Sequence, residues 1–82
     1  MHASDIEQLI QDSMPDAQVT VRGDDGVHFE ATVISETFVG KSLLQQHRLV
    51  YATLGDRLGN EEIHAPGTTK TFTPTAWQQR QT

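Results

Sequence analysis

Cysteine is absent from the 82-residue sequence. Its absence excludes disulfides, and it excludes zinc sites built from thiolates of this chain. An iron–sulfur cluster takes four ligands, most often thiolates. A chain without thiolates cannot hold such a cluster alone, so no cluster is expected in the isolated chain. The lack of cysteine also fits a reducing compartment.

Long apolar runs are missing as well, and none approaches the roughly 20 residues of a membrane-spanning helix. Residues 1–10 carry Asp5 and Glu7 and lack the apolar centre of a secretion signal. These two absences predict a soluble, cytoplasmic protein that does not enter the membrane.

Basic residues are few, with six Lys and Arg against eleven Asp and Glu and a net charge of −5. Clustered Lys and Arg bind phosphate backbones, so this balance argues against nucleic acid as the main ligand unless a local basic patch exists. The sequence also shows no nucleophile pattern and no phosphate-binding loop, and we expect it not to be an enzyme. Its length predicts a single domain over residues 1–82.

The first half of the chain predicts a helix followed by a hairpin. Ser4-Asp5-Ile6-Glu7 has the pattern of a capping box at the start of a helix over residues 4–14, which Pro15 ends. Two alternating runs, 19–22 and 27–34, flank the turn Gly23-Asp24-Asp25-Gly26 and predict an antiparallel pair. The valines and Phe29 are expected on its buried face.

The second half predicts a helix, a strand and a short final helix. Ser42-Leu43-Leu44-Gln45 is a second capping box, and the helix it starts is expected to end at Gly59-Asn60, with Gly55 bending or dividing it. A strand over residues 62–72 follows. Thr73-Pro74 then begins a last helical turn, with Trp77 folding back onto the domain and residues 77–82 otherwise forming a frayed tail. The apolar stripe of the long helix is predicted at Leu44, His47, Tyr51, Leu54 and Leu58, with Leu43 and Val50 alongside.

These elements predict an α/β fold of the α+β kind, in the order α-β-β-α-(α)-β-α. The connection between the second and third strands passes through a helix, which is typical of a parallel pair. We therefore expect a three-stranded mixed sheet with the helices on one face.

Several segments carry a resemblance to a known family in their order and approximate spacing. The chain resembles the BolA family, and its short turn with His28-Phe29 is most similar to the IbaG branch. This resemblance implies a domain similar to a type II KH domain, without the nucleic-acid loop of that domain. The segments are Phe38-Val39-Gly40-Lys41-Ser42, Gln46-His47-Arg48-Leu49-Val50-Tyr51, Ile63-His64-Ala65, and Thr71-Phe72-Thr73-Pro74 with Trp77.

The resemblance implies a function in iron–sulfur chemistry. BolA proteins bind monothiol glutaredoxins and share a bridging 2Fe–2S cluster with them and with glutathione, which implies a role in iron–sulfur trafficking or in iron and stress regulation. An alternative is a DNA-binding transcriptional regulator that uses a helix-turn-helix-like region. A third is an adaptor that meets the glutaredoxin without metal. Alone, the chain is expected to be a monomer or a homodimer.

Three residues are candidate metal ligands. His64 matches the C-terminal histidine of the family, although Pro66-Gly67 makes the following segment one residue longer than the family pattern. A second ligand in the family comes from the hairpin loop, where His28 is better suited than Asp25, a hard oxygen ligand. Without the resemblance, both histidines would be interpreted as exposed strand residues.

The remaining candidates are basic residues and one helical histidine. Lys41, Arg48 and Lys70 form the predicted basic patch, either for contact with a partner or nucleic acid or as a solvated face. His47 falls on the predicted apolar stripe and is expected to be a packed, hydrogen-bonded core residue.

Overall fold

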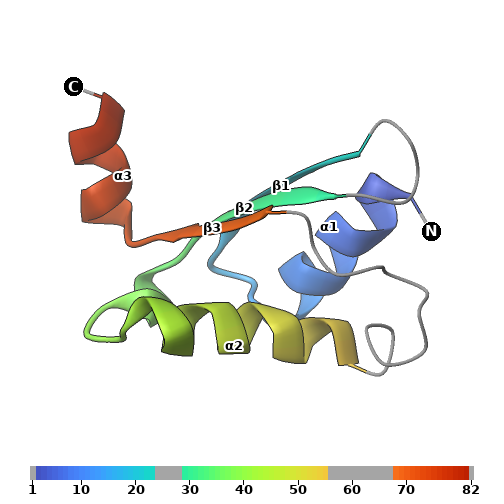
Figure 1. Cartoon of the computed structure of the whole chain (residues 1–82), viewed down its shortest axis with the longest axis horizontal. Helices are drawn as coiled ribbons and strands as arrows, with labels where there is room; N and C mark the ends of the chain where they lie inside the picture. The colour runs from blue at the N-terminus through green and yellow to red at the C-terminus, as the bar shows by residue number, and fades with distance from the viewer. Residues whose placement is uncertain (1, 24–28, 56–67, 82) are drawn as a thin grey trace.

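The computed structural model describes residues 2–23, 29–55 and 68–81. The predicted order of elements is confirmed within these ranges, and the optional division of the long helix falls outside them (Figure 1). The elements are α1 (Ala3–Ser13), β1 (Gln18–Arg22), β2 (Glu30–Ile34), a 3-10 helix η1 (Glu36–Phe38), α2 (Leu43–Leu54), β3 (Thr68–Phe72) and α3 (Pro74–Gln81).

The three strands form a mixed sheet in the order β1-β2-β3. β1 and β2 are antiparallel, with Val19 opposite Val33. β2 and β3 are parallel, with Ile34 beside Phe72. The prediction of a mixed sheet is therefore confirmed, and it follows from a connection of few residues between β1 and β2 and a helix in the connection between β2 and β3.

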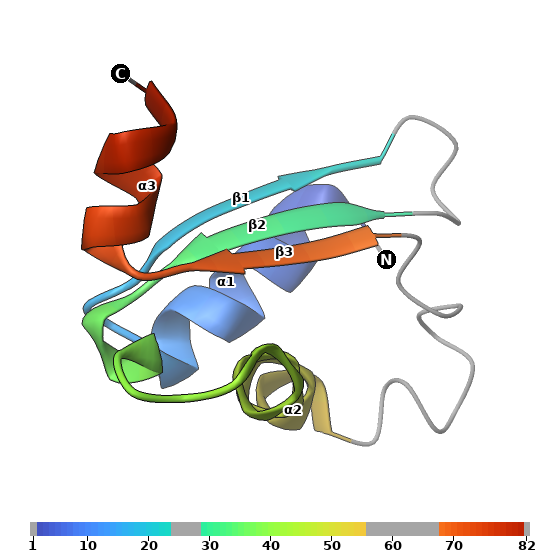
Figure 2. The ribbon, with the colours of Figure 1, turned by 60° about the vertical axis from the view of Figure 1, so that its left-hand side comes forward.

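α1 and α2 cover one face of the sheet, whereas α3 projects from the end of β3 on the other side (Figures 1 and 2). The prediction that all helices share one face is therefore wrong for α3. The sequence PTAWQQRQ gives α3 no apolar stripe that could enter the core.

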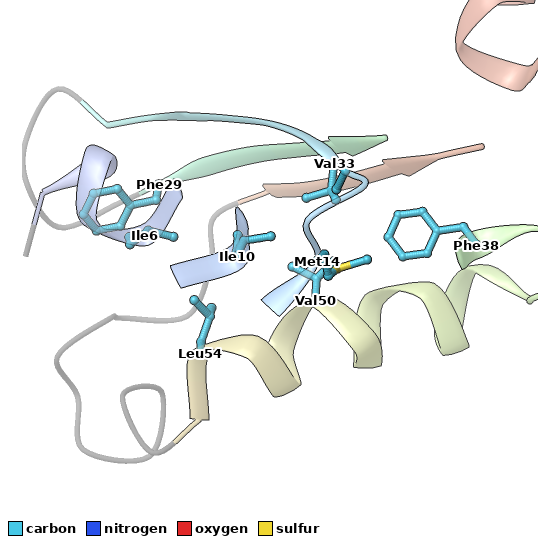
Figure 3. Packing of buried hydrophobic residues seen from close by; sticks show 9 residues of the cluster. Ile6, Ile10, Met14, Phe29, Val33, Phe38, Val50 and Leu54 are labelled. Atoms are coloured by element: carbon cyan, nitrogen blue, oxygen red, sulfur yellow. The ribbon is translucent and has the colours of Figure 1, made fainter. Parts of the chain in front are cut away.

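The core lies between the sheet and the two covering helices (Figure 3). From α1 it takes residues at i, i+4 and i+8, which face one way on a helix. From β2 it takes alternate residues, as predicted, and Phe38 of η1 closes one end with no exposed surface. The core residues labelled in Figure 3 are Ile6, Ile10, Met14, Phe29, Val33, Phe38, Val50 and Leu54.

Only one of the two predicted capping boxes exists. Ser42 Oγ accepts from the Gln45 amide at 3.2 Å and Gln45 Oε1 accepts from the Ser42 amide at 3.0 Å, as predicted for α2. The box predicted at Ser4 and Glu7 is wrong, because α1 starts at Ala3 and Asp5 accepts from the backbone N–H of His2 at 2.9 Å. The Glu7 carboxylate is turned toward β1 instead.

The stripe predicted on α2 is confirmed only at Val50 and Leu54. The buried residues of α2 are Gln46, Val50 and Leu54, whereas Leu44 is 60% exposed. His47 is only half-buried and lies beside Tyr51, so it is not the core residue that was expected. α2 ends at Leu54 with Gly55 at φ +56° as its C-cap, at the residue where a bend or division was predicted, and the end predicted at residues 59–60 lies outside the described residues.

The last helix is longer than predicted. Thr73 caps it as expected, its hydroxyl accepting from the Ala76 amide at 3.2 Å. The helix then continues through Gln81, so residues 77–81 are not a frayed tail. Trp77 does fold back, with its ring centroid 5.2 Å from that of Phe72. Arg80 lies over both rings, and this contact extends the order of the helix.

Candidate functional site

The three predicted metal ligands, Asp25, His28 and His64, lie outside the described residues. Within residues 2–23, 29–55 and 68–81, no group of three or more His, Cys, Asp and Glu side chains could hold a metal ion. The part of the chain that the structure describes therefore contains no complete metal site of its own.

The strand register nevertheless defines where the two candidate histidines join the fold. Glu30 at the start of β2 lies beside Thr68 at the start of β3. His28 precedes Glu30 by two residues, and His64 precedes Thr68 by four. The chain therefore enters both strands from the same end of the sheet (Figure 2). At about 3.3 Å per residue, the few residues that join each histidine to its strand limit how far it can lie from this end of the sheet.

This end of the sheet is firmly anchored. Phe29, immediately before β2, is only 4% exposed and lies close to Ile6 of α1 (Figure 3). On the other face of β2, Glu30 forms an ion pair with Lys70 at 3.5 Å. Both side chains are about half exposed, so this pair adds little stability. The buried Phe29 is the stronger anchor for the start of β2.

The structure does not bring the predicted basic patch together. Lys41 and Arg48 line one hollow of about 290 Å³, beside Gln45 and Leu49 of α2. Lys70 lies on the outer face of the sheet, the face that α1 and α2 leave uncovered, and lines a different hollow with Arg22 and Arg80. Sequence reasoning missed Arg22, although the strand alternation that buries Val21 places its neighbour on the outer face.

The segment Phe38–Ser42 is held by a buried polar chain. The hydroxyl of Thr71 donates to Gln46 Oε1 at 2.7 Å, and Gln46 Nε2 donates to the Lys41 carbonyl at 2.8 Å. Gly40 occupies the left-handed region at φ +79°, which favours glycine.

This fixed segment and the start of α2 present apolar side chains to solvent. Val39, Leu43 and Leu44 are each at least 60% exposed, and Lys41 lies among them in the sequence. The sequence pattern assigned the leucines to the core, so this exposed group was also missed.

No helix within the described parts of the chain is long and apolar enough to cross a membrane.

Comparison with known proteins identifies a family. The family model described as "BolA-like protein" matches residues 4–76. The structure of a BolA homologue from Coxiella burnetii superposes with a TM-score of 0.82 at 39% identity, covering 95% of this chain and 97% of that one. The acid stress protein IbaG of Escherichia coli K12 is 30% identical over 77 residues, which are 94% of this chain and 89% of IbaG.

Two further relatives match over a shorter stretch. The protein named "DNA-binding transcriptional regulator BolA" in Vibrio cholerae is 48% identical over 52 residues, 63% of this chain. BOLA2 of Arabidopsis thaliana is 42% identical over 60 residues, 73% of this chain. The chain spans 47% of the length of the Vibrio protein and 62% of that of BOLA2. With a family model over most of its length and a matching fold, the chain belongs to the BolA family.

Proposed function

We propose that this chain is a non-enzymatic partner protein that binds a monothiol glutaredoxin and shares a bridging 2Fe–2S cluster with it, acting in iron–sulfur trafficking or in iron and stress regulation. Membership of the BolA family supports the proposal, as does the name of the acid stress protein IbaG among the relatives. The proposed compartment is the cytoplasm.

The observation that carries the proposal is the parallel register of β2 and β3. It brings the chain into both strands at one end of the sheet, so the strand starts that follow His28 and His64 in the sequence lie side by side. In our proposal both imidazoles reach this end of the sheet and serve as neighbouring ligands. Asp25 remains a weaker candidate because a carboxylate is a hard ligand.

The donor set of the chain fits part of a cluster. The sequence offers four histidines and no cysteine, whereas a 2Fe–2S centre takes four ligands. The chain can supply one or two imidazoles, and thiolates of the glutaredoxin and of glutathione would supply the rest. A bound centre would add coordinate bonds between the two proteins.

The test is reconstitution of the purified chain with a monothiol glutaredoxin, iron, sulfide and glutathione. We expect a coloured heterodimer by size-exclusion chromatography with iron bound, and a visible circular dichroism spectrum that changes in His64→Ala. His2→Ala is the matched control and should leave the spectrum unchanged, because the backbone of His2 caps α1. Absence of a complex at micromolar concentrations would remove the proposal.

Chelation separates cluster sharing from the metal-free adaptor. If the heterodimer depends on the cluster, an iron chelator should dissociate it as the colour is lost. A complex that keeps its mass after complete removal of iron would instead identify the chain as an adaptor that meets the glutaredoxin without metal.

A second candidate function is DNA binding by a transcriptional regulator. Two observations favour it: Lys41 and Arg48 lie together at α2, and a relative in Vibrio cholerae is named a DNA-binding regulator. Two cations give weak binding unless a dimer doubles them. A labelled duplex should then bind at low salt, and the absence of any binding there would exclude this function.

A further inference from the structure

The outer face of the sheet is a patterned polar surface beside α3. Its side chains come from alternate strand positions, such as Thr20 and Thr32, which lie side by side in the register of β1 and β2. Together with Trp77 and Arg80 of α3 they line a hollow of about 400 Å³, here called the outer groove. No residue of the segment 38–42 is among its described lining residues.

Positive charge is concentrated in the outer groove. Arg22, Lys70 and Arg80 line it, which is three of the six Lys and Arg of the whole chain. Among the described residues of its lining, Glu30 is the single acidic one, and it is paired with Lys70. In a chain of net charge −5, this groove is thus a local cationic surface.

The side chain of Arg80 is held in place at the edge of this groove. Its guanidinium carbon lies 5.2 Å from the ring centroid of Phe72 and 5.8 Å from that of Trp77. These distances are typical of cation–π contacts, in which the ring faces orient the cation and leave its N–H groups available as donors. Less conformational entropy is then lost when an anion binds.

A second hollow, of about 670 Å³, adjoins the outer groove and has the opposite sign. The two share Gln18, Ile34 and Trp77 in their linings. The second hollow adds Asp16 and Glu36. A cationic and an anionic depression therefore meet at Trp77.

We propose that the outer groove and the adjoining hollow together bind an extended protein segment that carries acidic residues at one end and basic residues at the other. Its carboxylates would meet Arg22, Lys70 and Arg80, while its cations would meet Glu36. This pattern favours a protein segment over single-stranded nucleic acid, because a polyanion that leaves the cationic groove meets carboxylates and the net negative charge of the chain. The proposal is independent of cluster sharing.

The probe is a fluorescent peptide of sequence Glu-Glu-Glu-Ser-Ser-Lys-Lys-Lys with blocked ends, titrated into the full chain alone, without iron or glutaredoxin. We expect saturable binding by anisotropy at low salt, with NMR shifts at the Trp77 indole and at Thr20 and Thr32. Arg22→Gln should weaken binding by about two- to fivefold, as expected for an exposed charge pair.

Arg48→Gln is the matched control, since it removes the same charge from α2 and should leave the affinity unchanged. Equal weakening by both variants would show that only long-range charge attracts the peptide, and would overturn the proposal. So would tighter binding of an eight-nucleotide oligothymidine than of the peptide, or no binding at millimolar peptide.

Discussion

Thr71 in β3 and Gln46 in α2 are joined by a buried hydrogen bond of 2.7 Å between their side chains. Both residues are less than 9% exposed. Gln46 also forms a second hydrogen bond, in which its Nε2 donates to the Lys41 carbonyl at 2.8 Å. A buried polar group is expensive when left unpaired. The pair therefore fixes α2 against the last strand and also fixes the turn before α2.

Replacement of either member should destabilise the fold. Gln46→Leu leaves both the Thr71 hydroxyl and the Lys41 carbonyl unpaired, so we expect a loss of about 2–6 kcal/mol, at 1–3 kcal/mol for each group. Thr71→Val should cost about 1–3 kcal/mol by the same reasoning, and the double variant less than the sum. Urea denaturation measures all three. The control Thr20→Val, on the exposed outer face, should change stability by no more than about 0.5 kcal/mol.

Replacing the two serines of the predicted capping boxes should change the free energy of unfolding by different amounts. Ser42 accepts from the Gln45 amide as the N-cap of α2, so Ser42→Ala should lower the free energy of unfolding by about 1 kcal/mol. Ser4 lies within the first turn of α1, and Ser4→Ala should have no measurable cost because alanine favours helix. Comparable losses for the two variants in thermal or urea unfolding would contradict the capping assignment.

Phe38 and its neighbour Val39 offer a second matched pair. Phe38 is fully buried and closes the core, whereas Val39 is 64% exposed. Phe38→Ala should cost about 3–5 kcal/mol through lost burial and the cavity that remains. The free energy of unfolding of a domain of 82 residues is about 4–12 kcal/mol, at 0.05–0.15 kcal/mol per residue. We expect Phe38→Ala to have a much lower unfolding midpoint by circular dichroism, whereas Val39→Ala should keep the native spectrum and its unfolding midpoint.

The sequence predicted the sheet well because one physical rule decides it. Alternation with period two assigns Val33 to the core and Thr32 to the outer face, and a slip of one residue would reverse every assignment. The order of elements then follows from the turn signal in the sequence at residues 23–26 and from the helical connection before β3. Both depend on local sequence, which is where a pattern is informative.

The phase of α2 could not be predicted in the same way. Leu43 and Leu44 are apolar, yet they lie at the helix start and remain largely exposed. Gln46 is polar, yet it is buried because Thr71, 25 residues later, satisfies its amide. A pattern of apolar residues along the helix cannot reveal a hydrogen-bond partner so distant in the sequence. For the same reason, the sequence could not show that Lys70 and Lys41 lie on different surfaces. The proposed ligand roles of Asp25, His28 and His64 stay predictions.

Because Lys41 and Lys70 lie on two different surfaces, their replacement should affect the salt dependence of DNA binding differently. If the chain binds a duplex through α2, the logarithm of the binding constant should fall with the logarithm of salt by about 0.9 for each phosphate contact. Replacing Lys41 and Arg48 with glutamine should then reduce that slope by about 1.8, as measured by anisotropy of a labelled duplex across a salt series. Lys70→Gln is the control, because Lys70 lies on the outer face with Arg22 and Arg80. An equal change of slope in Lys70→Gln would show that the DNA contacts both surfaces, and would contradict recognition through α2 alone.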